Sequence, residues 1–174
     1  METILNQRKI LVTGASGFIG SFVVEGALER GMQAWAGIRR TSSRKYLQDE
    51  RIQFAELYFA NKDKLKKQLS IHKKEHEGWD YIIHCAGVTK CRNKEDFDKG
   101  NYVATVNFVE ALQELDMVPS HFIYISSLSI FGPIHEDTYQ PISENDEAQP
   151  NTAYGISKLK SEKYLQGLKN FPFV

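Results

Sequence analysis

The sequence is poor in the features that mark secreted, membrane-spanning and nucleic-acid-binding proteins. It has only two cysteines, and its 22 basic residues are matched by 22 acidic ones, so no net charge draws it toward nucleic acid or an anionic membrane. No apolar run approaches the roughly 18 residues that a membrane span requires. The first residues also lack the charged and apolar regions of a signal peptide. We therefore expect a cytoplasmic protein with neither a nucleic-acid nor a membrane partner.

A metal-binding pattern is missing as well. His72 and His76 stand one helical turn apart, but no third ligand accompanies them and the spacing is not that of an H-E-x-x-H motif. His84 ends a run typical of a buried strand and is interpreted as a satisfied core histidine. The hydrophobic content of 41% is enough for one well-buried core in 174 residues. We expect a single domain over residues 1–174 with no metal site.

A glycine-rich run near the start has the surroundings of a phosphate-binding turn. A buried-strand pattern over residues 9–12 precedes it, and apolar residues at helical spacing follow over residues 18–30. Gly14 allows a tight turn, Gly17 lets the backbone approach phosphates, and Gly20 lets the helix pack against the strand. The N–H groups at the start of the helix would hold the pyrophosphate of a dinucleotide. A merely structural turn is the alternative, because the spacing is G-x-x-G-x-x-G rather than G-x-G-x-x-G.

The next expected strand, residues 33–38, ends in arginines where an acid is more usual. In NAD-binding proteins an Asp or Glu about 20 residues past the glycines holds the ribose 2′-hydroxyl, whereas an arginine accommodates a 2′-phosphate. Because a guanidinium binds phosphate in bidentate fashion, Arg39 is the first candidate for 2′-phosphate recognition, supported by Arg40, Ser42 or Arg44. A solvated basic loop is the alternative.

A tyrosine and a lysine near the end of the chain are candidates for proton transfer. Tyr154 and Lys158 stand at i and i+4, so they share one face of a helix. A phenol is a poor base at neutral pH, but a neighbouring cation favours the phenolate. The buried-strand pattern over residues 122–125 delivers Ser126 and Ser127 at its carboxyl end, where open α/β sheets bind ligands. The alternatives are a chance surface pair and serine hydroxyls that only satisfy the backbone.

Together these motifs resemble the extended short-chain dehydrogenase/reductases, also called the NAD-dependent epimerase/dehydratase family. The resemblance runs from Lys9 to Val174 and includes Asp80-Tyr81-Ile82-Ile83-His84-Cys85-Ala86-Gly87, Asn101-Tyr102-Val103-Ala104-Thr105-Val106-Asn107 and Ser126-Ser127-Leu128-Ser129-Ile130-Phe131-Gly132. It implies that Ser127 hydrogen-bonds the reacting oxygen, that Tyr154 is the general acid/base, and that Lys158 binds the nicotinamide ribose and favours the phenolate. It also implies a set of cofactor-binding residues: Gly14, Ser16, Gly17, Phe18, Ile19, Gly20, Ala86, Gly87, Tyr154 and Lys158.

Some positions depart from the family pattern. Glu56 and Leu57 stand where many members have an aspartate that contacts the adenine, and they are assigned to the cofactor site with Arg39 and Arg40. Arg39 occupies the place of an NADP-binding arginine in reductases of the dihydroflavonol reductase type, so the expected cofactor is NADP, with NAD as the alternative. Phe131 replaces a usual tyrosine and removes one hydroxyl from the substrate side. The C-terminal substrate-binding part of the family is expected to be absent, so the sequence does not name the substrate.

We therefore expect an α/β fold with a doubly wound parallel sheet, a Rossmann fold. Strands are predicted near residues 9–13, 33–38, 52–56, 80–85 and 121–126, and helices near 18–30, 62–76, 95–115 and 152–168, with the sheet order 3-2-1-4-5. By resemblance, helices 97–115 and 154–168 would pair with their symmetry mates in a homodimer. The expected activity is hydride transfer between the nicotinamide and a carbinol or carbonyl carbon, as in an epimerase, dehydratase or reductase, with a nucleotide sugar or a small ketone or alcohol as substrate. The alternative is a non-catalytic dinucleotide-binding or redox-sensing module.

Overall fold

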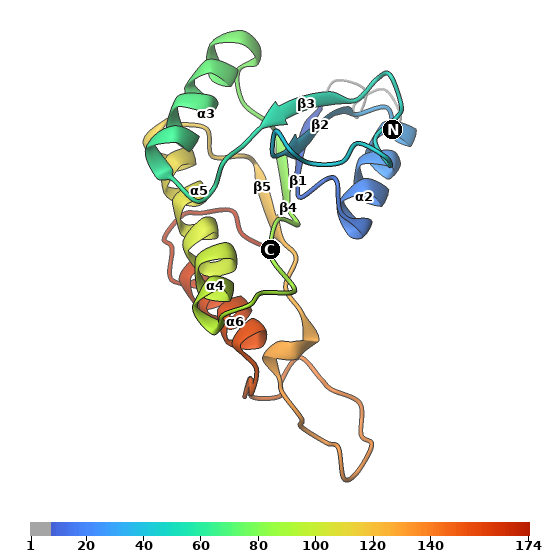
Figure 1. Cartoon of the computed structure of the whole chain (residues 1–174), viewed down its shortest axis with the longest axis vertical. Helices are drawn as coiled ribbons and strands as arrows, with labels where there is room; N and C mark the ends of the chain where they lie inside the picture. The colour runs from blue at the N-terminus through green and yellow to red at the C-terminus, as the bar shows by residue number, and fades with distance from the viewer. Residues whose placement is uncertain (1–7) are drawn as a thin grey trace.

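Five parallel strands form the central sheet of this computed structural model, which describes residues 8–174 (Figure 1). The strands are β1 (Lys9–Thr13), β2 (Gln33–Ile38), β3 (Gln53–Glu56), β4 (Tyr81–His84) and β5 (His121–Tyr124). They lie in the order β3-β2-β1-β4-β5, and every neighbouring pair is parallel. The order reverses between β1 and β4, which is the point where such sheets bind ligands. The predicted fold class and strand order are confirmed.

Helices cover the two faces of the sheet unequally. They are α2 (Phe18–Glu29), α3 (Lys62–His76), α4 (Lys94–Phe97), the π-helical segment η1 (Asp98–Val103), α5 (Ala104–Glu114), the 3-10 segment η2 (Leu128–Ile130) and α6 (Ala153–Gln166). Figure 1 shows α2 on one face of the sheet and α3, α5 and α6 on the other. Within residues 8–174, none of the helices combines the length and the apolar character that crossing a membrane requires.

The helix predicted over residues 95–115 is not a regular α-helix. Its α4 and α5 parts follow one another along the chain, but the π-helical turn η1 separates them. Gly100 lies on this turn, and a Cβ there would come within 2.6 Å of the Val88 side chain. The turn therefore lies close to the loop after β4, and helical spacing in a sequence carries no information about such a contact.

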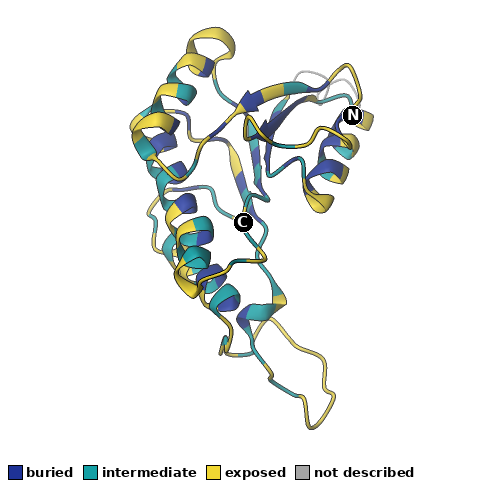
Figure 2. Cartoon of the chain, in the orientation of Figure 1, coloured by how far each residue is buried: buried dark blue, intermediate teal, exposed yellow. Residues whose placement is uncertain are grey.

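Side chains alternate along each strand, so the sheet has a separate core on each face. Ile10 and Val12 of β1 pack with Val24 and Leu28 of α2, whereas Leu11 points into the other layer. That layer also buries side chains from three helices: Leu65 and Leu69 of α3, Phe108 and Leu112 of α5, and Leu165 of α6. Figure 2 shows buried residues on the strands and on the inner faces of the helices. This core fixes the carboxyl ends of the strands, where the candidate site lies.

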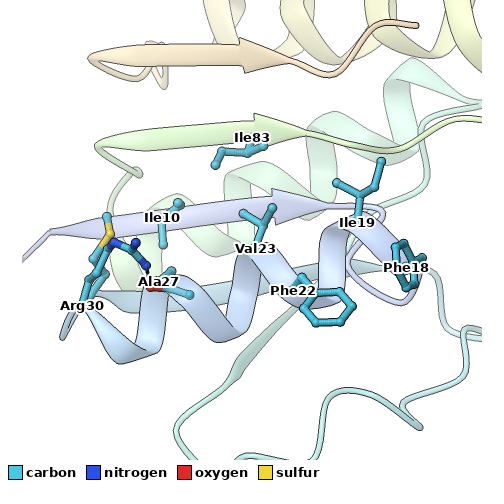
Figure 3. A pocket seen from close by; sticks show the side chains of 10 residues that line it. Ile10, Phe18, Ile19, Phe22, Val23, Ala27, Arg30 and Ile83 are labelled. Atoms are coloured by element: carbon cyan, nitrogen blue, oxygen red, sulfur yellow. Dashed lines mark hydrogen bonds between the residues drawn. The ribbon is translucent and has the colours of Figure 1, made fainter.

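An apolar groove of about 690 Å³ runs beside α2 (Figure 3). Phe18, Ile19, Phe22 and Val23 of the helix line it together with Ile83 of β4. Phe18 is 79% exposed and Phe22 is 58% exposed. The groove exists because, within residues 8–174, α2 is the only helix on this face, whereas parallel sheets are normally covered on both faces.

The last residues lie against β5 at the edge of the sheet. Phe173 forms a parallel bridge with Phe122, and the N–H groups of Phe122 and Tyr124 donate to the carbonyl oxygens of Pro172 and Val174 at 2.7 and 3.0 Å. Residues 131–152, between η2 and α6, form a loop that extends away from the body of the domain (Figure 1).

Candidate cofactor-binding and active site

The fold itself requires two of the three glycines, Gly14 in the loop from β1 to α2 and Gly20 in the first turn of α2. Gly14 has a φ of +65°, and a Cβ there would lie 2.8 Å from the backbone of Ala86. A Cβ at Gly20 would lie 2.5 Å from the carbonyl oxygen of Gly14. Any side chain at these two positions would collide with backbone, so both glycines are explained without a ligand.

Gly17 is different, because the described part of the chain constrains it less tightly than the other two glycines. Its φ is −84° and its ψ is 171°, and a Cβ would meet only the carbonyl oxygen of Gly14, at 3.2 Å. Gly17 is the N-cap of α2, and the N–H groups in the first turn of a helix have no acceptor within the helix. The missing side chain leaves these donors open to an anion, as a pyrophosphate site demands. The side chains of Phe18 and Ile19 line the apolar groove, and Ser16 is half-buried in the loop.

The basic residues predicted to recognise the 2′-phosphate lie at the carboxyl end of β2. Arg39 and Arg40 are exposed, and neither has an ion-pair partner within residues 8–174. A short turn holds the backbone here, since the Arg39 N–H donates to Ser42 Oγ at 3.1 Å and the Ser42 N–H donates to the Arg39 carbonyl at 2.9 Å. The Arg44 guanidinium lies 4.0 Å from the centroid of the Phe54 ring and so is directed toward β3.

The two candidates at the end of β3 are not equivalent. Glu56 is exposed and is paired in the sheet with Ile38, the residue before Arg39. Leu57 is 2% exposed and belongs to the core, so only its backbone can reach a ligand. The structure therefore brings Glu56 and Arg39 to one edge of the sheet and directs the Leu57 side chain away from it.

Ala86 is held beside the glycine loop by a buried network centred on His84. The Thr105 hydroxyl donates to the Asn101 carbonyl at 2.7 Å, so its oxygen accepts from His84 Nε2–H across 3.1 Å. His84 Nδ1 is then the acceptor for the Thr13 hydroxyl at 2.7 Å, and the oxygen of Thr13 accepts the Ala86 N–H at 3.1 Å. One neutral tautomer satisfies every donor. Burial lowers the pKa of His84 to about 3, which keeps it neutral, and the interpretation as a satisfied core histidine is confirmed.

Asn101 is a buried residue to which the sequence motif alone gave no role. Its Oδ1 accepts the Val88 N–H at 2.7 Å, and its Nδ2 donates to the Val88 carbonyl at 3.1 Å and to Ser157 Oγ at 2.9 Å. The Ser157 hydroxyl donates in turn to the Tyr154 carbonyl at 2.7 Å. A Cβ at Gly87 would lie 2.8 Å from Asn101 Oδ1, so a glycine is needed beside this amide. The loop after β4 and the start of α6 are thereby joined.

Lys158 is buried at the carboxyl end of β5. Its Nζ donates to the Ile125 carbonyl at 2.6 Å and lies 4.0 Å from the centroid of the Tyr124 ring. Burial lowers the pKa of this ammonium to about 8. A chance surface lysine would remain in water, so the burial of this cation favours a functional position over a chance pair.

Tyr154 and the serine segment meet at the first turn of α6. Tyr154 is half-buried, and its ring packs edge-on against Phe97 with 6.1 Å between centroids. Ser127 caps η2, where its Oγ accepts the Ser129 N–H at 3.2 Å. A Cβ at Gly155 would overlap the carbonyl oxygen of Ser129, so α6 packs directly on the serine segment. Ser127 and Lys158 therefore lie at the carboxyl end of β5, and Tyr154 lies in the first turn of the helix that packs there.

Both cysteines are free thiols, and the one in the site is unreactive. Cys85 follows β4, and burial raises the pKa of its thiol to about 11. The thiolate, which is the nucleophilic form, is therefore disfavoured.

The parallel sheet, the glycine turn at its first strand and the buried lysine at the opposite side of the switch point define a Rossmann-type domain. The chain belongs to the NAD dependent epimerase/dehydratase family, whose model matches residues 10–170.

Individual relatives agree with this family. A protein of Methanocaldococcus jannaschii is 29% identical over 162 residues, which cover 90% of this chain and 50% of the relative. The UDP-glucose 4-epimerase of Pisum sativum is 26% identical over 95% of this chain and 49% of its own length. Among solved structures, the enzyme WbmH of Bordetella bronchiseptica in complex with NAD+ has a TM-score of 0.74 and 26% identity, with 96% of this chain and 54% of that chain covered. This chain spans about half the length of the curated relatives it matches.

Proposed function

We propose that the chain holds a nicotinamide dinucleotide across the carboxyl edge of the sheet and supplies the proton-transfer residues of a family enzyme. The observation that carries the proposal is the buried Lys158, one turn after Tyr154 and on the opposite side of the switch point from the glycine loop. Gly17 supports it independently, because the described residues crowd a Cβ there less than at Gly14 or Gly20.

The proposed cofactor is NADP rather than NAD. With the pyrophosphate at the start of α2, the adenosine half would lie beyond β2, near Arg39 and Arg40, and the nicotinamide half would lie toward β4 and β5. Two exposed guanidinium groups without an ion-pair partner within residues 8–174 suit a 2′-phosphate. Glu56 lies at the same edge of the sheet. Because its carboxylate and the 2′-phosphate would repel each other, Glu56 would contact the adenine rather than the phosphate.

A bound nicotinamide would supply hydride-transfer chemistry at this site, and the residues of the chain would handle the proton. Tyr154 transfers the proton of the reacting oxygen, and Ser127 hydrogen-bonds that oxygen. The ammonium of Lys158 would bind the nicotinamide ribose. The neutral His84 is tied to Thr13 and Thr105 and takes no part in the proton transfer.

The proposed substrate class is a nucleotide sugar, in keeping with the UDP-glucose 4-epimerase of pea. Because this chain spans about half of such relatives, the groups that would read the sugar are not assigned within it. A small ketone or alcohol is the alternative substrate.

The test is turnover with a panel of nucleotide sugars, small ketones and alcohols, measured on the longest native form of the protein. Tyr154→Phe should lower kcat about 10²–10⁴-fold and leave cofactor affinity nearly unchanged, because only the proton transfer is lost. Tyr164→Phe is the matched control, because Tyr164 lies on the same helix with its ring against Tyr102. Full turnover by Tyr154→Phe on a verified substrate would remove the proton-transfer role.

A non-catalytic dinucleotide-binding or redox-sensing module is the second candidate. It predicts tight cofactor binding without turnover of any member of the panel, and a cofactor affinity that does not respond to Tyr154→Phe.

A further inference from the structure

We propose that the exposed face of α2 is a contact surface between copies of this chain, on which the helix packs antiparallel against the α2 of a second copy. This surface lies on the opposite face of the sheet from α5 and α6, and the proposal goes beyond the proposed function. It rests on the apolar groove beside α2, whose lining residues complement one another when one copy is turned by half a rotation against the other.

The groove side of α2 carries an apolar stripe that residues 8–174 leave partly exposed. Ile19, Phe22, Val23 and Gly26 follow the i, i+3, i+4, i+7 spacing of one helix face, and all four line the groove. Phe22 is 58% exposed and Ile19 is 52% exposed. A different face of the same helix already packs in the core through Val24. A second apolar stripe beside an uncovered part of the sheet indicates a further contact.

Large and small residues are divided between the two halves of this helix. Phe18, Phe22, Gly26 and Arg30 form one row, because each lies four residues after the one before, and all four line the groove. Figure 3 shows Phe18 and Arg30 at opposite ends of the helix. Apart from the backbone of its own helix, a Cβ at Gly26 would meet only the end of the Arg30 side chain, Nη1, at 3.2 Å. The row therefore has two rings in its first half and a position without a side chain in its second half.

Such a row is self-complementary when two copies of α2 lie antiparallel. A two-fold axis midway between Phe22 and Gly26 places Phe22 of each copy against Gly26 of the other, and it places Phe18 against Arg30 of the other. Rows of residues four apart interdigitate in the commonest class of helix packing. The Arg30 side chain donates to the Gly26 carbonyl at 2.7 Å and has no ion-pair partner within residues 8–174. The face of a phenyl ring attracts such a cation, so shape and charge both match.

The size of the contact predicts a weak association. A fully covered aromatic side chain buries about 150–250 Å². Phe18 and Phe22 are 79% and 58% exposed in the free chain. The four rings of two copies would therefore bury about 400–700 Å², and the surface that they cover would roughly double this area. Because stable interfaces bury at least about 1,200 Å², we expect a transient contact with a Kd of about 10⁻⁴ M.

Sedimentation equilibrium of residues 1–174 tests the proposal. Between about 10 and 500 μM the weight-average mass should rise about 1.5-fold, as a Kd of about 10⁻⁴ M requires. Phe22→Glu should remove this rise, because it places a charge in the apolar contact. Ile71→Glu is the matched control, since Ile71 is 57% exposed on α3, outside the groove. The control should leave the rise unchanged.

A second variant separates association from folding. Gly26→Ala should weaken the association about tenfold, because a methyl group there holds the facing ring away. The same variant should raise the Tm of the chain by about 1–4 °C, because alanine is favoured over glycine inside a helix. Opposite effects on association and on Tm exclude partial unfolding as the cause of the weaker contact.

A mass that does not rise with concentration, or a rise that Phe22→Glu leaves unchanged, would overturn the proposal. Loss of the rise in Ile71→Glu as well would show non-specific association, with the same consequence. A folded Gly26→Ala protein that associates as tightly as the unaltered chain would refute the antiparallel pairing. If the mass of the longest native form of the protein did not respond to Phe22→Glu, another segment would occupy the groove, and a contact between copies would be excluded.

Discussion

Replacing Gly17 by valine should separate cofactor binding from folding. The fold tolerates a side chain there, because the φ of −84° suits any residue and a Cβ meets only one carbonyl oxygen, at 3.2 Å. Losing glycine at an N-cap and shifting that carbonyl by a few tenths of an ångström should cost about 1 kcal/mol. In a domain of this size that lowers Tm by about 2–4 °C. The valine side chain would stand where the phosphates approach, so NADPH affinity should fall by a factor of about 100 or more.

Other glycines of the chain provide the controls for this experiment. Gly20→Ala should disturb folding, since its Cβ would lie 2.5 Å from the Gly14 carbonyl oxygen. Gly78→Ala should change neither folding nor binding, because a Cβ there meets nothing within 4 Å. Circular dichroism and NADPH titration on the same samples give both readouts. A folded Gly17→Val protein that binds NADPH normally would refute the assignment of this loop to the pyrophosphate.

Three further predictions concern the cofactor, the buried lysine and the assembly. Arg39→Ala should weaken NADP binding about tenfold and leave NAD binding unchanged, because one charge-assisted phosphate contact is lost. Arg51→Ala removes a charge that is already paired with Asp49, so it should leave the binding of both cofactors unchanged. Equal losses of affinity for the two cofactors in Arg39→Ala would contradict the assignment. Lys158→Met should abolish tight cofactor binding. The same variant should stabilise the free domain at pH 7 by about 1–2 kcal/mol, because burying the ammonium costs more free energy than its hydrogen bond contributes. The pKa of this lysine is 10.5 in the unfolded chain and about 8 in the folded domain, so the unfolded chain binds more protons between these values. The stability of the unaltered domain relative to that of the variant should therefore rise from pH 8 to 10.5 in denaturation experiments. Light scattering at tens of micromolar should give the mass of a homodimer paired through α5 and α6, and a monomeric mass would count against that arrangement.

The sequence predicted the sheet well because its signals are local. The strands at residues 9–13 and 33–38 were predicted with the bounds of β1 and β2, and the helix at 62–76 with those of α3. Each is a periodic apolar run closed by a polar or glycine residue. The π-helical turn was missed because it depends on how Gly100 and Asn101 meet Val88, a residue distant in the sequence.

The sequence predicted only part of the candidate site, because the site depends on contacts between residues that are distant in the sequence. Spacing identified Tyr154 and Lys158, but it could not tell that the lysine is buried on the Ile125 carbonyl while the side chain of Leu57 turns into the core. The three glycines looked alike in the sequence, and only the backbone contacts separate the two required by the fold from Gly17. Asn101 carried a signal in its motif, yet its contacts to Val88 and Ser157 exist only in three dimensions.

Equilibrium titration of the unaltered chain with NADPH and NADH tests the central claim most directly. We expect saturable binding of one nicotinamide dinucleotide per chain, with NADPH bound about tenfold or more tightly than NADH. Tighter binding of NADH would contradict the role given to Arg39. A folded chain that binds neither dinucleotide would contradict the account as a whole.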